Sequence, residues 1–187
     1  KNAVVNIAPS VPSPMRQPVY KVLSEEIAQR SGITLKASGS SAAKSAQAIM
    51  IALSSDPALN SEILARLDKA GSEFKKEGFR VVSMPGNTIW IVGADARGVL
   101  FGAGWLLRNL HMEKGIVQLN APVDHASSPA YPIRGHQLGY RTSANADDAV
   151  DGKQYEKYIR ELAIFGSNAV ECIPFHEDDS PSPHFKI

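Results

Sequence analysis

Apolar and polar residues follow two spacings along the chain, one typical of strands and one typical of helices. Short apolar runs predict strands over Ala3–Ile7 and Ala48–Leu53, and the second run is continuous, as in a central strand buried on both faces. Apolar residues at helical spacing predict one helix over Pro18–Arg30 and another that begins at Asn60, whose side chain can cap it. Before the first helix, an irregular loop is indicated by Pro9, Pro12, Pro14 and Pro18.

The middle of the chain predicts a hairpin followed by a third helix. Two β-rich runs, Glu77–Met84 and Thr88–Val92, flank the turn sequence Pro85-Gly86-Asn87. Asp95 can then cap a helix whose apolar residues share one face, namely Val99, Ala103, Leu106, Leu107 and Leu110. With short strands expected over 33–36 and 115–119, the order of elements indicates an α+β fold in which helices pack on a mixed sheet.

A change of pattern divides the chain. Residues 121–132 are rich in proline and have no periodicity, so we expect an accessory α/β domain over 1–120, a linker over 121–132 and a second block over 133–187. The second block predicts a strand over 133–140, a helix over 152–165 and a strand over 169–173, which form a β-α-β unit with parallel strands. A complete (β/α)₈ barrel takes about 250 residues, so this block supplies only the start of one.

Composition and charge narrow the class of protein. The 187 residues are 43% hydrophobic and 21% charged, which is typical of an ordered globular protein. A formal net charge of +1, with basic and acidic residues mixed, argues against a nucleic-acid partner. No apolar run reaches the roughly 20 residues that span a bilayer. The single Cys172 excludes an internal disulfide framework and a multi-cysteine zinc site, and we expect no metal and no cofactor.

Four glycines lie where the second hairpin strand runs into the third helix: Gly93, Gly98, Gly102 and Gly104. A dinucleotide fingerprint needs its glycines in the turn itself, and neither that spacing nor the P-loop spacing is present. Glycines inside the helix instead favour close packing of the helix on the sheet. A nucleotide-binding enzyme is therefore disfavoured. For Arg97, a surface charge and a tie between the two domains both remain open.

Polar side chains are concentrated in the expected strand after the linker. Arg134, His136, Tyr140 and Arg141 are candidates for ligand contact, because polar residues near the carboxyl ends of barrel strands face the active-site mouth. Arginine can hold hydroxyls or a carboxylate, and tyrosine offers a ring face and a hydroxyl. Glu171, in the following strand, is a further candidate for contact with sugar hydroxyls. The alternative is a buried hydrogen-bond network between the domains. The segment His176-Glu-Asp-Asp179 predicts a solvated loop rather than a metal site.

The segment Gly93–Leu110, with the linker and the pair Arg134-Gly135, resembles the accessory domain and barrel entry of two glycoside hydrolase families. These are the β-N-acetylhexosaminidases of family 20 and the α-glucuronidases of family 67. The resemblance implies an accessory domain beside a (β/α)₈ barrel, and it implies that Arg134 binds sugar hydroxyls. The chain departs from the hexosaminidase pattern after Gly135, where it continues as His136-Gln-Leu-Gly-Tyr-Arg141.

The resemblance further implies an oligo- or polysaccharide ligand and a secreted or periplasmic location, although no apolar leader segment follows Lys1. Our leading hypothesis is the N-terminal region of a glycoside hydrolase, whose partner is the remainder of its own barrel. The families carry their catalytic carboxylates on later barrel strands, so we assign no catalytic residue and expect the chain to be silent by itself. The alternative is a free-standing carbohydrate-binding or protein-interaction module.

Overall fold

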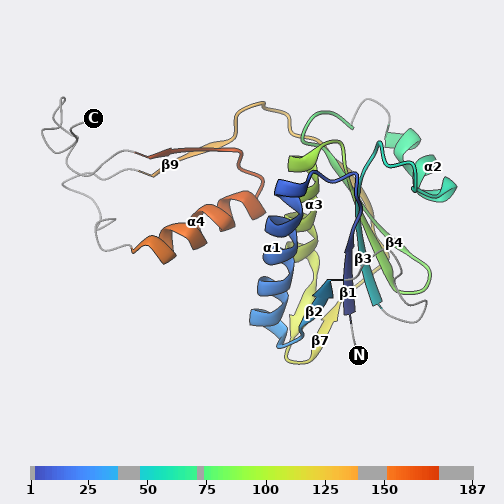
Figure 1. The fold of residues 1–187 in the computed structure, drawn as a ribbon, viewed down its shortest axis with the longest axis horizontal. Coiled ribbons are helices and arrows are strands. Elements are labelled where there is room, and N and C mark those ends of the chain that lie inside the picture. The colour runs from blue at the N-terminus through green and yellow to red at the C-terminus, as the bar shows by residue number, and fades with distance from the viewer. Residues whose placement is uncertain (1–2, 38–46, 71–73, 139–150, 173–187) are drawn as a thin grey trace, which may run out of the picture. The chain divides into compact units, whose positions relative to one another are not determined.

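A computed structural model describes residues 3–37, 47–70, 74–138 and 151–172. The chain forms two compact units, a first unit over residues 1–130 and a second unit over residues 131–187. The first unit is built on a six-stranded sheet with helices on both of its faces (Figure 1). The described part of the second unit contains two parallel strands and one helix.

The sheet of the first unit has the strand order β2-β1-β3-β5-β4-β8. Strands β2, β1, β3 and β5 are parallel, whereas β4 runs antiparallel to both β5 and β8. The strand bounds are β1 (Ala3–Ile7), β2 (Leu35–Ala37), β3 (Gln47–Leu53), β4 (Phe79–Met84), β5 (Thr88–Gly93) and β8 (Asp124–Ser127). The predicted mixed α+β sheet is confirmed, and β3 occupies the interior position that its continuous apolar run indicated.

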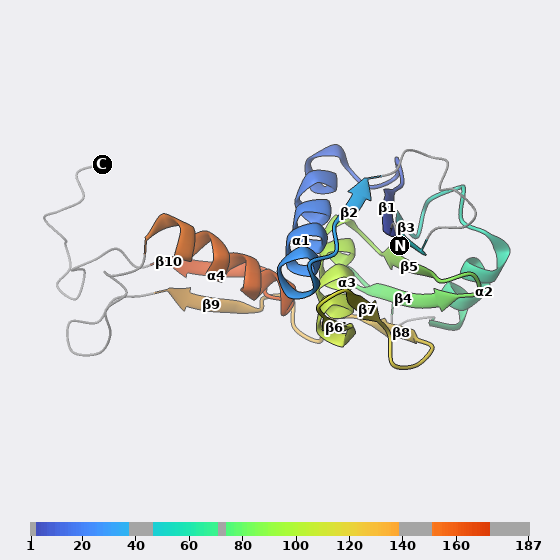
Figure 2. The ribbon, with the colours of Figure 1, turned by 90° about the horizontal axis from the view of Figure 1, so that it is seen from below.

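Two helices cover one face of the sheet and a third covers part of the other. Helices α1 (Ser13–Ser31) and α3 (Ala96–Asn109) lie side by side on the first face, and α2 (Ser61–Ala70) lies on the opposite face (Figures 1 and 2). The second face has its own buried cluster under α2, made of Ala52, Leu59, Ile63, Val82 and Val92. The first unit is therefore a three-layer sandwich, although the layer formed by α2 is short.

The predicted caps and turn are confirmed. The side chain of Asn60 accepts a hydrogen bond from the amide of Ile63 at 2.8 Å, which satisfies one free donor at the start of α2. Strands β4 and β5 form the predicted hairpin, closed by the pair Met84 and Thr88. Gly86 and Asn87 both have positive φ angles, of 84° and 60°, a conformation that glycine and asparagine adopt more readily than other residues.

The first helix begins earlier than the prolines indicated. We predicted a start at Pro18, but α1 begins at Ser13 and includes both Pro14 and Pro18. Pro14 lies in the first turn, where the missing N–H costs no intrahelical bond and the fixed φ angle already suits a helix. At the other end, Gly32 caps the helix in the left-handed conformation.

The segment after α3 agrees with one prediction and differs from another. The strand expected over 115–119 is present as β7 (Ile116–Gln118), which pairs with β6 (His111–Glu113) in a separate hairpin and not with the main sheet. The linker expected over 121–132 contains β8, which pairs with β4 as the edge strand of the sheet. In the second unit, the described strands are β9 (Gly135–Leu138) and β10 (Ala169–Cys172), joined through α4 (Gly152–Ile164).

The glycines at the β5–α3 junction are a packing device, as their spacing indicated. A Cβ atom at Gly98 would collide with the carbonyl oxygen of Gly78, and one at Gly102 would lie 2.7 Å from the side chain of Ile91 in the sheet. Gly98 and Gly102 are both buried. The missing side chains therefore let α3 approach the sheet and the turn before β4 closely.

We expect Gly98→Ala to lower the free energy of unfolding by about 3 kcal/mol, the upper end of the cost of overpacking, because the clash is with backbone. Urea denaturation followed by circular dichroism measures this change. Gly152→Ala is the matched control, because a Cβ there has open space, and it should be neutral or stabilise by less than about 1 kcal/mol. Equal stability of the two variants would show that the contact at Gly98 does not constrain the fold.

Candidate functional site

The sequence candidates belong to the second unit, around the parallel pair β9 and β10. The strand register pairs Gly135 with Ala169 and His136 with Val170. Helix α4 connects the two strands and begins with a capping box, in which the Asp151 carboxylate accepts from the amides of Lys153 and Gln154, both at 2.9 Å. The predicted β-α-β unit with parallel strands is thus present.

Arg134 joins the loop before β9 to the loop before β10. Its Nε donates to the carbonyl oxygen of Gly166 at 2.8 Å, and its Nη1 donates to that of Tyr131 at 2.9 Å. The backbone of Arg134 is also held, since its amide donates to the Asn168 side chain and its carbonyl accepts from the Asn168 amide, each at 2.9 Å. Asn168 completes the connection by donating to the carbonyl oxygen of Pro132 at 2.8 Å. We call this set of residues the Arg134 clasp; it consists of Tyr131, Pro132, Arg134, Gly166 and Asn168.

The clasp lies at the amino ends of both parallel strands, because Arg134 precedes β9 and Asn168 precedes β10. In (β/α)₈ enzymes, the active site is built at the opposite, carboxyl ends of the strands, and residues at the amino ends serve stability. Backbone carbonyl oxygens satisfy two of the donors of the Arg134 guanidinium within the second unit itself. The geometry therefore gives Arg134 a structural role in joining the two strands.

His136 contacts the helix of the second unit. Its Nε2 lies 2.8 Å from the hydroxyl of Tyr158 on α4, and the two rings meet edge to face with centroids 5.6 Å apart. His136 therefore lies on the face of β9 that α4 covers. The pair with Tyr158 is thus both polar, through the hydroxyl, and aromatic, through the rings.

The remaining candidates are described less fully or not at all. The backbone of Glu171 pairs with Gln137, one position along from the pair of His136 with Val170. Tyr140, Arg141 and the segment 176–179 lie outside the described residues. Within the described ranges, no group of three or more potential metal ligands comes together. Nor does any helix in those ranges have the length and apolar character to cross a membrane.

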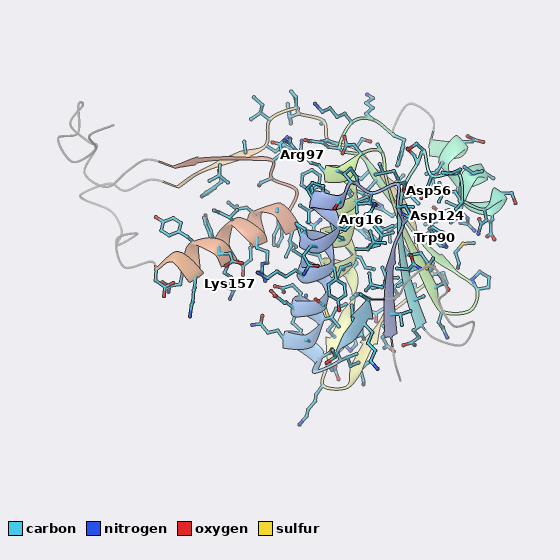
Figure 3. The ribbon with its side chains drawn as sticks, viewed as in Figure 1. Arg16, Asp56, Trp90, Arg97, Asp124 and Lys157 are labelled. Atoms are coloured by element: carbon cyan, nitrogen blue, oxygen red, sulfur yellow. The ribbon has the colours of Figure 1, made fainter. Side chains whose placement is uncertain are left out.

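Arg97 has a partner within the first unit. Arg97 is labelled in Figure 3. Its guanidinium forms an ion pair with Glu77 at 2.8 Å, in which the Glu77 side chain is 5% exposed and the Arg97 side chain 57% exposed. The Asp95 carboxylate links the same two segments, because one oxygen caps α3 at the amide of Gly98 and the other accepts from the amide of Glu77 at 2.8 Å. The sequence left open a surface charge or a tie between the two domains for Arg97. The structure shows a different role, in which Arg97 ties α3 to the turn before β4.

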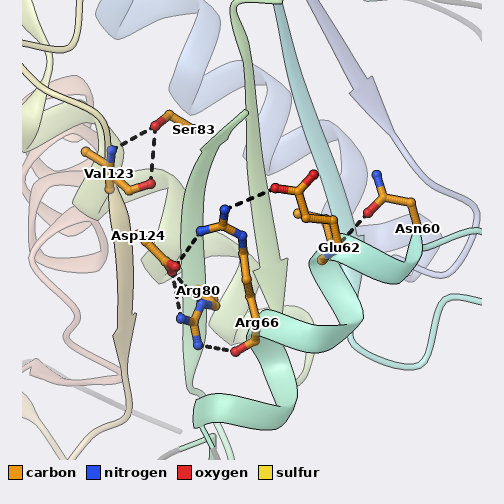
Figure 4. A network of polar contacts seen from close by, with 8 residues as sticks. Asn60, Glu62, Arg66, Arg80, Ser83, Val123 and Asp124 are labelled. Atoms are coloured by element: carbon orange, nitrogen blue, oxygen red, sulfur yellow. Dashed lines mark hydrogen bonds and ion pairs between the residues drawn. The ribbon is translucent and has the colours of Figure 1, made fainter. Parts of the chain in front are cut away.

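Sequence reasoning missed an ionic network on the face of the sheet covered by α2. Asp124 of β8 accepts from Arg80 of β4 at 2.7 Å and from Arg66 of α2 at 2.6 Å, and Arg80 also donates to the carbonyl oxygen of Arg66 (Figure 4). Partial burial of Asp124 acts to raise its pKa, but the hydrogen bonds from Arg80 and Arg66 outweigh it and hold the pKa below its ordinary value. The network binds the edge strand, its neighbour and α2 together.

His125, the next residue of β8, belongs to the opposite face. Its ring stacks on Trp105 of α3 with centroids 4.5 Å apart and planes 9° from parallel, and it meets Phe79 at 6.1 Å. Burial in this aromatic slot lowers the pKa of His125, and the charge of Arg80 lowers it further. The neutral imidazole is the form that the folded chain favours.

The fold is shared with glycoside hydrolases of known structure. One is an exo-β-N-acetylglucosaminidase of family 20 from Vibrio harveyi in complex with N-acetylglucosamine, with a TM-score of 0.59 and 18% identity over 91% of this chain and 22% of that chain. Another is the family 20 β-N-acetylhexosaminidase from Streptomyces coelicolor A3(2), with a TM-score of 0.63 and 17% identity over 91% of this chain and 30% of that chain.

A 4-O-methyl-α-glucuronidase of family 115, with specificity for decorated arabinogalactans, has the same fold, with a TM-score of 0.59 and 16% identity over 91% of this chain and 25% of that chain. No protein-family model and no curated protein matches the sequence. The resemblance to family 20 enzymes inferred from the sequence is confirmed for the fold. The chain spans less than a third of the length of each of these enzymes.

We expect Arg134→Ala to accelerate amide hydrogen exchange at Asn168, whose N–H donates to the backbone held by the clasp, and to destabilise the second unit by about 1–3 kcal/mol. Lys157→Ala on α4 (Figure 3) is the control, because this exposed pair with Glu161 at 3.8 Å should contribute under about 0.5 kcal/mol. Exchange measured by NMR distinguishes the variants. Unchanged protection of Asn168 in Arg134→Ala would exclude the clasp.

The lowered pKa of His125 predicts a pH dependence of stability. Because the unfolded chain binds the proton more readily, the free energy of unfolding should rise with pH from the lowered pKa up to the ordinary value of 6.5. His125→Phe keeps an aromatic ring in the slot and removes the titration. Chemical denaturation at several pH values should show the wild type losing stability relative to this variant as pH falls below 6.5. A constant difference would contradict the assignment.

Proposed function

We propose that this chain is the N-terminal region of a carbohydrate-active glycoside hydrolase. In this proposal, the first unit is an accessory domain, and the second unit is the first β-α-β of the catalytic barrel. The observation that carries the proposal is the parallel pair β9 and β10 with α4, which follows an α+β unit within one fold shared with family 20 and family 115 enzymes.

The second unit has the surface of an incomplete assembly. The described part of this unit has two strands and one helix, and several of its large apolar side chains are exposed. The exposed fractions are 74% for Tyr131, 76% for Ile133 and 69% for Phe165. Apolar side chains on this scale favour further packing partners. We propose that the partner is the remainder of the chain's own barrel.

A saccharide is the proposed ligand of the complete barrel. The Vibrio harveyi relative was solved with N-acetylglucosamine, which supports this class of ligand. We propose that sugar contacts arise near the carboxyl end of β9, where Tyr140 and Arg141 follow the strand, and at Glu171 of β10. The contacts of Arg134 with Gly166 and of His136 with Tyr158 support a positioning role for these two candidates. A secreted or periplasmic location belongs to the same proposal.

The chain alone should not turn over substrate. Glycoside hydrolysis canonically needs two carboxyl groups flanking the bond, or substrate assistance in some families, and we assign the catalytic carboxylates to later barrel strands. The role of this region is then to begin the barrel and to support it.

We expect no hydrolysis of aryl glycosides by the 187-residue chain, and hydrolysis by the polypeptide encoded by the full reading frame. Release of nitrophenol from nitrophenyl N-acetylglucosaminide and nitrophenyl glucuronide measures both. Glu171→Gln in the 187-residue chain is the control for a hidden activity. Turnover by this chain that the variant abolishes would sink the proposal, as would a reading frame without further β-α units.

A further inference from the structure

A hollow of about 820 Å³ opens in the first unit, at the amino ends of β3 and β5. Its base is formed by aliphatic side chains of the sheet, including Ile49 and Ile89, which the register places side by side. The β6–β7 hairpin forms one wall through Val117 and Gln118, and the chain continues along the hollow to Asn120. The volume lies within the range of small-molecule sites, about 300–1,000 Å³.

Backbone and side-chain hydrogen bonds fix the walls in place. The amide of Gly115 at the hairpin turn donates to the carbonyl oxygen of Ser31 at the end of α1, at 2.7 Å. The hydroxyl of Ser83 accepts from the amide of Val123 at 2.8 Å and donates to its carbonyl oxygen at 3.2 Å, which joins the end of β4 to the chain that leaves the hollow. The hollow is therefore formed before any ligand arrives.

The chemistry of the lining restricts what the hollow can hold. None of the lining residues that the structure describes is charged or aromatic, so they offer neither an ionic partner for an anion or cation nor a ring for stacking. The base is aliphatic, whereas the lining also includes exposed residues with amide side chains, namely Gln47, Gln118 and Asn120. Within the described ranges, no side-chain hydrogen bond occupies these three amides.

Amides donate and accept hydrogen bonds at once, as sugar hydroxyls do. An aliphatic base favours a small apolar substituent, and it gains free energy by removing Ile89 and Val117, both only partly buried, from water. We propose that the hollow is a saccharide site of the first unit, selective for an uncharged sugar that carries an N-acetyl group. The choice of a saccharide rests on the proposed function; the selectivity rests on the lining itself.

Titration of the 187-residue chain with N-acetylglucosamine, glucose and glucuronate, followed by NMR of ¹⁵N-labelled protein, tests the proposal. N-acetylglucosamine should give saturable shifts at the amides of Ile49, Ile89 and Val117. Glucose should bind more weakly because it lacks the acetyl methyl, and glucuronate should give no saturable shifts at matched ionic strength, since none of the described lining residues pairs with its charge.

The double variant Gln118→Ala with Asn120→Ala should weaken N-acetylglucosamine binding roughly fivefold or more through lost hydrogen bonds. Gln17→Ala, an exposed amide on α1 outside the hollow, is the matched control and should bind as the wild type does. Both variants alter exposed side chains, so an unchanged circular dichroism spectrum should accompany the loss.

Three results would overturn the inference: equal binding of glucuronate, no saturable shifts at the hollow, or saturable shifts there with isopropanol but not with the sugar. The last result would favour an apolar side chain of a protein partner as the occupant. Sugar-induced shifts confined to the second unit would remove this site and leave the proposed function standing. Glycoside hydrolysis by the full reading frame tests that function separately.

Discussion

The first unit depends on one close approach of backbone to backbone, where the start of α3 meets the turn before β4. Gly98 lies against the carbonyl of Gly78, and the amide of Ala94 donates to that same carbonyl oxygen at 2.9 Å. Asp95 holds both sides of the contact through its two carboxylate oxygens. Because β5 leads directly into α3 and pairs with β4, this single contact sets the position of the helix layer, the interior of the sheet and the hairpin together.

Features that depend on local chemistry could be predicted from the sequence. A cap at Asn60 and a turn at Gly86 and Asn87 each follow from what a few neighbouring residues can do, and a glycine inside a helix, as at Gly98, indicates close packing even before its partner is known. The edge strand β8 could not be predicted in this way. Its Asp124 is held by Arg66 and Arg80, which precede it by 58 and 44 residues, so a segment that reads as linker becomes a strand only when the sheet is present.

Proline and the candidate site illustrate two further limits. A proline in the first turn of a helix looks like a loop signal, although the missing N–H has no bond to lose there. For Arg134 and His136, the sequence identified the unusual polarity but not the partners. The carbonyl oxygens of Gly166 and Tyr131 carry no sequence signal, and no spacing along the chain indicated that the Tyr158 hydroxyl would meet His136. The hollow, likewise, joins segments that show no chemical motif when read singly.

Both edges of the six-stranded sheet are short, since β2 has three residues and β8 has four. An open sheet edge is a template for another chain, and long flat edges lead to aggregation. In β8 the edge also carries Asp124, whose carboxylate is committed to two arginines, and Pro129 follows soon after the strand. The ionic network therefore does more than fasten β8 to its neighbours. Together with the shortness of β8, it helps to leave an edge that offers a second molecule few free backbone groups for strand pairing.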